Sequence, residues 1–213
     1  MLRKIFLCCC VTLALSYASL NAQQTEPPAG VIKADGGFPS EGTKWVARAG
    51  MEGGPAQTTT FTVVVQETYE GKPVWKVIGG IDTLFFDKDT ANLIASLQGG
   101  KDVFAYSPHS GLFLWPLWVG KSWTATFTYD DRVQGTKFEG FREEYTAQAY
   151  EDITVPAGTW KAFRIHSQTG RTSTTVWYAP DIKLIVKRSN ETATDQSSGH
   201  TKFVYELVEY PVK

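Results

Sequence analysis

The sequence predicts an all-β protein whose strands form a curved antiparallel meander or a half-open β-barrel. Three observations support this fold class. Residues 122–130 alternate with period two, with Trp, Ala, Phe and Tyr on one side and Thr or Asp on the other, as in a half-solvated antiparallel strand. Turn-forming residues recur between the apolar segments. No window of 11 or more residues has a convincing helical period.

The expected strands follow one another along the chain with short connections. Residues 58–69 repeat the period-two alternation, and Pro156–Gly158 is one of the turn signals that separate strands. The stretch 89–97 could also hold a short helical turn. Tight turns favour an up-and-down meander, which at this length must curl or close to cover its apolar face and its edges. The expected strands cover residues 44–49, 58–69, 73–79, 81–87, 92–97, 102–107, 122–130, 140–155, 159–168, 172–179, 183–189 and 200–210.

Two stretches of the chain have a similar order of features and could form two related halves. One runs from Glu67 to Ile94 and the other from Glu151 to Ile185. Each contains a strand, a turn, a strand with Trp-Lys, a strand with an aromatic pair and an aliphatic strand. The spacing between the Trp and the aromatic pair differs by several residues. A chance match of two β-meanders is therefore the alternative.

The N-terminus has the layout of a secretory signal peptide. Arg3 and Lys4 precede an apolar run over 5–15, and small residues before Gln23 offer a cleavage site after Ala22. We therefore predict a signal peptide over 1–22, a flexible lead-in rich in Pro and Gly over 23–43, and a single all-β domain over 44–213. An uncleaved anchor is the alternative, but the apolar run is too short for a spanning helix.

The charge and composition of the chain after signal cleavage limit which partners can be expected. Cleavage after Ala22 removes all 3 cysteines and leaves 19 basic against 22 acidic residues, a balance of −3. That charge gives no reason to expect nucleic acid or an anionic membrane as a partner. No apolar run after the signal peptide is long enough for a transmembrane span. We expect a cysteine-free exported protein of the bacterial envelope, periplasmic or extracellular.

One region resembles a known family. The segments Val155–Ile165 and Thr175–Lys187 resemble exported bacterial proteins classed as domain of unknown function 3108, and Leu117–Trp123 looks like the start of that family's second half. The resemblance implies a curved antiparallel sheet or half-barrel and leaves the function open. Lys183 departs from the pattern, because the family would have glycine there, and this departure could alter the turn after Asp181.

The sequence offers no recognisable catalytic or metal-binding arrangement. The 3 histidines are far apart in the chain, and no cysteine remains to complete a zinc site. Adjacent acidic residues such as Glu143 and Glu144 point to opposite faces of a strand, so such a pair does not form a two-carboxylate site. We expect no catalytic residues, no metal, no cofactor and no enzyme activity. A hydrolase whose residues converge only in three dimensions is the alternative.

Aromatic residues supply the candidate binding site. Phe113, Trp115, Trp118 and Trp123 lie close together in a stretch that also contains Leu and Pro. Such apolar side chains must be buried, either in the core or against a ligand. We predict that these four residues bind an apolar ligand, such as an acyl chain, or an apolar segment of an envelope protein on a concave sheet face. A structural envelope protein without a small ligand is the alternative.

Overall fold

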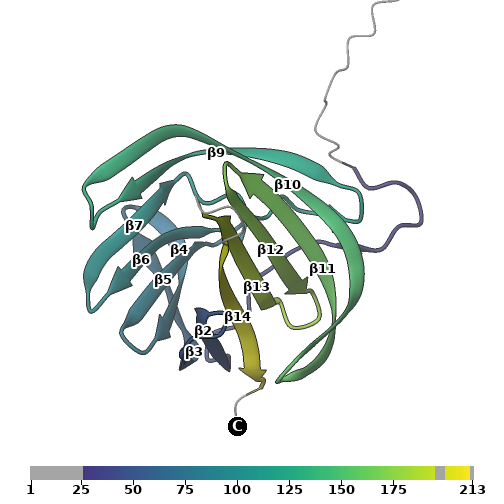
Figure 1. Cartoon of the computed structure of the whole chain (residues 1–213), viewed down its shortest axis with the longest axis horizontal. Helices are drawn as coiled ribbons and strands as arrows, with labels where there is room; N and C mark the ends of the chain where they lie inside the picture. The colour runs from purple at the N-terminus through teal and green to yellow at the C-terminus, as the bar shows by residue number, and fades with distance from the viewer. Residues whose placement is uncertain (1–25, 195–199, 212–213) are drawn as a thin grey trace, which may run out of the picture.

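The computed structural model describes residues 26–194 and 200–211, and its regular structure is entirely β (Figure 1). The predicted all-β class is therefore confirmed. The strands are β1 (Lys33–Ala34), β2 (Lys44–Met51), β3 (Ala56–Tyr69), β4 (Lys72–Gly79), β5 (Asp82–Asp87), β6 (Leu93–Gln98), β7 (Lys101–Ser107), β8 (Leu117–Trp118), β9 (Ser122–Asp131), β10 (Thr136–Val155), β11 (Gly158–Thr169), β12 (Thr172–Ala179), β13 (Leu184–Ala193) and β14 (His200–Glu209).

Twelve strands form a closed antiparallel barrel in chain order. They are β2 to β7 and β9 to β14, and β14 pairs with β2 to complete the circle, with Tyr205 opposite Ala49. Every strand pairs with the preceding and following strand of the barrel, so the predicted meander is confirmed. The sheet closes fully rather than stopping half-open, and closure leaves no long free edge. The stretch that could have held a helical turn has one hydrogen-bonded turn, from Ala91 N to Asp87 O at 2.9 Å, before β6 begins.

Two short segments pass inside or across the barrel. A twelve-strand barrel is wider than the eight-strand kind whose interior side chains alone can fill. Part of the extra space is taken by residues 108–121, here called the crossing segment, which includes β8. Its Trp118 pairs with Lys33 of β1, in the chain just before the barrel. The stretch 26–43, suggested by composition as part of a flexible lead-in, thus holds buried Ala34 and a Phe38 that packs against the core.

The crossing segment also closes the seam between β7 and β9. These two strands pair only from Phe104 to Ser107 on the β7 side. Beyond that point the crossing segment takes over, with Ser110 N donating to Leu93 O at 2.8 Å and Trp123 Nε1 donating to Gly111 O at 3.0 Å. The barrel wall is therefore complete although β7 ends early.

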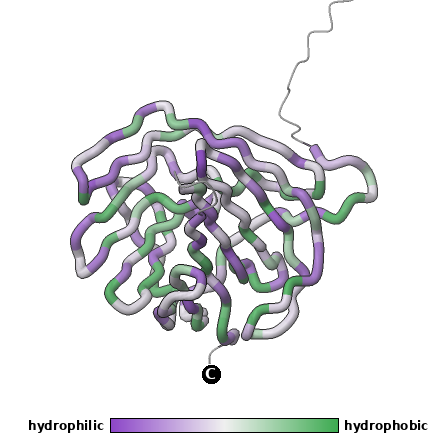
Figure 2. Tube along the Cα trace, viewed as in Figure 1, coloured by the Kyte–Doolittle hydropathy of each residue, from purple (hydrophilic) through white to green (hydrophobic). Residues whose placement is uncertain are grey.

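The core has an inner and an outer part. Leu84 and Phe86 of β5 line the interior, whereas Phe85 between them packs in a separate cluster with Val74 and Ala105. Because successive strand residues point to opposite faces, this smaller core lies on the outer face of the barrel wall. Figure 2 shows hydrophobic and hydrophilic residues interspersed along the strands, as expected for a wall with two different faces.

Candidate functional site

The barrel encloses a cavity of about 310 Å³ beside the crossing segment. Its wall is mostly aromatic and aliphatic and comes from strands on all sides of the barrel. Phe203 is 38% exposed and Lys183 is exposed, so the lining reaches the surface at these residues. Apolar lining residues are Phe38, Trp45, Phe61, Leu84, Phe86, Ala91, Leu93, Leu112, Phe113, Phe127, Val176, Leu184, Ile185 and Phe203.

One part of the cavity wall is a packed aromatic surface. Trp45 stacks on Phe61 with ring centroids 5.5 Å apart, and Phe38 packs on Phe86 at 5.0 Å. The indole N–H of Trp45 donates to the Tyr205 hydroxyl at 3.1 Å. Since this polar group is satisfied, the surrounding wall offers rings and aliphatic carbons to the cavity, which suits an apolar occupant.

A second part of the wall is polar and carries two opposite charges. Glu143 on β10 and Arg188 on β13 both line the cavity and are half-buried. Glu143 Oε1 accepts a hydrogen bond from Ser167 Oγ at 2.7 Å, and Arg188 Nε donates to Asn190 Oδ1 at 2.7 Å. No ion pair within 4.0 Å joins the two charges. Each of these two charged side chains is thus hydrogen-bonded to a neutral side chain.

The tyrosines around the cavity are neutral hydrogen-bonding groups. Burial raises the pKa of Tyr106 and of Tyr205 to about 12 each. Burial, followed by the nearby Glu143 carboxylate, raises the pKa of Tyr145, and burial raises the pKa of Tyr178. Loss of water disfavours the phenolate form. At neutral pH these four hydroxyls are therefore protonated and able to donate.

Of the four residues predicted to bind a ligand, Phe113 is the one that lines the cavity. Trp115 stacks on Phe113 at 4.8 Å, and both rings contact Tyr178. The Trp115 indole N–H donates to Thr90 O at 2.7 Å. Trp115 therefore lies behind Phe113 and supports the wall that Phe113 forms.

The other two predicted residues are buried in the core and do not line the cavity. Trp118 is 1% exposed and lies under Lys121, whose Nζ is 4.5 Å from the ring centroid and donates to two backbone carbonyls of the crossing segment at 2.6 and 2.8 Å. Trp123 stacks on Tyr145 at 5.4 Å. The structure thus places Phe113, Trp115 and Trp123 in one hydrophobic cluster, whereas Trp118 packs beneath Lys121.

Sequence reasoning missed the polar residues of the cavity. Arg188 follows Leu184 and Val186 at alternate positions of β13, and Glu143 precedes Tyr145 in the same way on β10. A charged residue in register with apolar ones would lie on the inner face of a closed sheet. This alternation was the available sequence signal. It can be interpreted only once the sheet is known to close into a barrel.

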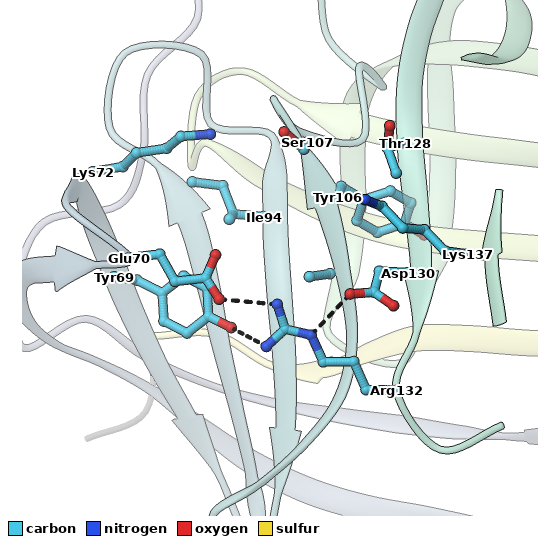
Figure 3. A pocket seen from close by; sticks show the side chains of 11 residues that line it. Tyr69, Glu70, Lys72, Ile94, Tyr106, Ser107, Thr128, Asp130, Arg132 and Lys137 are labelled. Atoms are coloured by element: carbon cyan, nitrogen blue, oxygen red, sulfur yellow. Dashed lines mark hydrogen bonds and ion pairs between the residues drawn. The ribbon is translucent and has the colours of Figure 1, made fainter. Parts of the chain in front are cut away.

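A second hollow of about 220 Å³ lies on the outer face near β7 and β9 and is polar (Figure 3). Arg132 dominates it, with donor groups 2.9 Å from Glu70, 2.9 Å from Asp102, 3.2 Å from Asp130 and 3.2 Å from the Tyr69 hydroxyl. Hydrogen bonding to Glu70 is the main influence that raises the pKa of Arg132 above its ordinary value. The guanidinium is already surrounded by acceptors. We therefore interpret this cluster as structural, because it connects the β3–β4 turn to the paired strands β7 and β9.

The described residues contain no group of side chains suited to hold a metal ion. Within 26–194 and 200–211, no three His, Cys, Asp or Glu side chains are grouped to hold a metal ion. His166 Nδ1 lies 3.4 Å from Thr175 Oγ1, and half-buried His109 has a buried Nδ1 without a hydrogen-bond partner. The same part of the chain contains no helix long and apolar enough to cross a membrane. The predicted signal peptide lies outside the described residues.

Comparison with known proteins gives distant likenesses. No protein-family model and no curated protein matches the chain, so the family resemblance stays a prediction. The hypothetical lipoprotein YmcC from Escherichia coli is 11% identical, with a TM-score of 0.43 over 84% of this chain and 93% of that one. A Bacteroides fragilis protein with a YmcC-like fold is 12% identical, with a TM-score of 0.41 over 83% and 98%.

A third solved structure, a Parabacteroides distasonis protein provisionally classed as a lipoprotein, is 17% identical. Its TM-score is 0.36 over 81% of this chain and 96% of that one. These three TM-scores are too low to define a shared fold.

Proposed function

We propose that this protein is an exported, non-catalytic binding protein of the bacterial envelope that holds an apolar ligand inside its barrel. The observation that carries the proposal is the cavity of about 310 Å³ with a largely aromatic and aliphatic lining that reaches the surface at Phe203. Such a volume lies at the lower end of the range of small-molecule sites. Export is inferred from the N-terminal sequence alone.

The energetics favour a ligand that replaces water in this cavity. Burying apolar surface contributes on the order of 25 cal/mol per Å², so an acyl chain of about 200 Å² would gain about 5 kcal/mol before the costs of association. A gain of this size corresponds to a dissociation constant of about 0.2 mM, and those costs weaken the binding of a simple chain to the millimolar range or beyond. The protein would therefore carry or sense such a molecule rather than hold it permanently.

A cavity-filling substitution tests the proposal. Leu84 lines the cavity from β5, and Thr83 beside it points to the opposite face. Leu84→Trp should fill the cavity, while Thr83→Trp adds the same side chain outside and serves as the control. We expect the unaltered protein and Thr83→Trp to bind dodecan-1-ol, measured by displacement of a fluorescent anilinonaphthalene sulfonate, and Leu84→Trp to bind it at least tenfold more weakly.

The outcome separates ligand binding from a purely structural role. If Leu84→Trp stays folded by circular dichroism and binds dodecan-1-ol as well as Thr83→Trp does, the interior is not the site. If neither the unaltered protein nor the control binds the alcohol or the dye, the cavity has no ligand of this class. In that case the aromatic residues serve the core.

A further inference from the structure

The polar part of the cavity wall contains hydrogen-bond donors that have no protein acceptor among the described residues. The terminal guanidinium nitrogens of Arg188 have no hydrogen-bond partner among the described residues, since its recorded bond is from Nε to Asn190. The Tyr106 hydroxyl likewise has no partner in that part of the chain. The Tyr145 hydroxyl differs, because it has a contact of 3.5 Å to Ser110 O and lies close to the Glu143 carboxylate. Arg188 and Tyr106 therefore have donor groups that a ligand could engage.

The nearby acceptor is already engaged. The Glu143 carboxylate accepts from Ser167 at 2.7 Å and lies close enough to Tyr145 to affect its pKa. It lies beyond 4.0 Å from any Arg188 nitrogen. Of the two half-buried charged groups in this part of the wall, Arg188 is therefore the one whose terminal nitrogens have no partner among the described residues. A half-buried guanidinium without an anion is costly.

We propose that the ligand is a single-chain amphiphile with an anionic head, such as a long-chain carboxylic acid, whose carboxylate binds Arg188. This inference rests on the proposed apolar-ligand function and names the class of ligand. Guanidinium is suited to two-point recognition of a carboxylate, and the protonated Tyr106 hydroxyl supplies a further donor.

The size and shape of the cavity favour one chain rather than two. A volume of about 310 Å³ is small for a lipid with two acyl chains, because ligand sites start near 300 Å³. The remaining lining, which includes Phe38, Leu84 and Phe86, is apolar. With its head at Arg188, the chain would extend along this apolar wall.

Matched ligands test the charge preference. Isothermal titration at pH 8 compares dodecanoate, dodecan-1-ol and dodecylammonium, which differ at the head group. We expect dodecanoate to bind about tenfold more tightly than dodecan-1-ol, since charge-assisted hydrogen bonds are stronger than neutral ones, and dodecylammonium to bind most weakly. If dodecan-1-ol binds but the three affinities are equal, or the ammonium binds best, the proposed head-group site is wrong and the apolar function stands. If none binds, the apolar function itself fails.

Matched variants locate the effect. Arg188→Gln should lower dodecanoate affinity about tenfold and leave dodecan-1-ol binding unchanged, whereas Arg188→Lys should keep part of the preference. Arg48→Gln is the control, because Arg48 pairs with Glu206 at 2.8 Å away from the cavity lining and should change neither affinity. Equal losses for both ligands in Arg188→Gln would contradict the proposal.

A second variant keeps the test decisive if Arg188→Gln does not fold. Glu143→Gln removes the negative charge near the proposed head-group site and preserves the side-chain shape. We expect it to raise dodecanoate affinity several-fold and to leave dodecan-1-ol binding unchanged, because like charges near a site disfavour an anion. Unchanged or weaker dodecanoate binding would contradict a carboxylate site in this part of the wall.

Discussion

Asn92 binds the backbone of Phe113 at both of its polar groups. The Asn92 Nδ2 donates to Phe113 O at 2.9 Å, and Phe113 N donates to Asn92 Oδ1 at 2.8 Å. Asn92 is 1% exposed. One side chain thus satisfies a buried peptide unit as a neighbouring strand would, and it fixes the crossing segment against β6 where Phe113 lines the cavity.

Loss of this pair should loosen the crossing segment. Asn92→Ala leaves the buried N–H and C=O of Phe113 without partners, and we expect the free energy of unfolding to fall by about 2–4 kcal/mol. Urea unfolding followed by tryptophan fluorescence measures the change. Gln98→Ala, which removes an exposed amide at the end of β6, the strand that follows Asn92, should cost less than about 1 kcal/mol. Equal losses would show that Asn92 does not hold the segment.

Gly36 tests the packing of the chain before the barrel. It has φ +90°, and a Cβ there would lie 2.5 Å from the Trp115 ring. Gly42 has a similar φ of +81° with nothing within 4 Å of an added Cβ. Both Gly→Ala substitutions strain the backbone, but Gly36→Ala also forces Trp115 to move. We expect Gly36→Ala to cost about 1–3 kcal/mol more than Gly42→Ala in thermal or urea unfolding, and equal costs would rule out the close contact with Trp115.

Lys183 adopts a conformation that favours glycine. Its φ is +57°, in the left-handed region that costs a residue with a Cβ about 1 kcal/mol or more. Lys183→Gly should therefore be more stable than Lys183→Ala, which removes the same long side chain but keeps the Cβ. We expect a difference of about 1 kcal/mol in the free energy of unfolding. If the alanine variant is as stable as the glycine variant, the turn does not impose this backbone strain.

His109 should make the stability depend on pH. Burial holds the pKa of His109 below its ordinary value of 6.5, although the nearby Asp87 carboxylate opposes the effect. The unfolded chain therefore binds a proton more readily than the folded protein, so stability is fully present above pH 6.5 and falls as the pH drops towards the folded-state pKa. His109→Asn should flatten this part of the stability profile between pH 7 and pH 5. A profile unchanged by the substitution would exclude His109 as its source.

Many strands of the barrel could be predicted from the sequence, because strand formation leaves local patterns. Period-two alternation and turn residues are local properties, so they identify strands such as 122–130 before any pairing is known. The turn near Asp181 was also visible, because the glycine expected at position 183 corresponds to a left-handed residue in the structure. Residues 33–34 and 117–118 were missed as strands, since pairs this short leave no periodic pattern.

The cavity could not be predicted in the same way, because it depends on long-range closure. Whether Arg188 faces solvent or the interior depends on two long-range pairings. One joins β14 to β2, where Glu206 and Arg48 are 158 residues apart, and the other joins β7 to β9. The aromatic stretch drew attention to Trp118 and Trp123, yet both rings are buried without lining the cavity. Aromatic density indicates burial, but it does not distinguish a packed core from a ligand site.

The central claim is that an apolar chain binds inside the barrel. The most direct test is a crystal structure of the full chain with 12-bromododecan-1-ol, in which the anomalous signal locates the bromine atom. We predict one bromine peak within the cavity, in contact with lining residues such as Leu84, Phe86 or Leu112. A bromine peak confined to the outer surface, or an interior that stays free of the compound under conditions where the protein is saturated, would contradict the account.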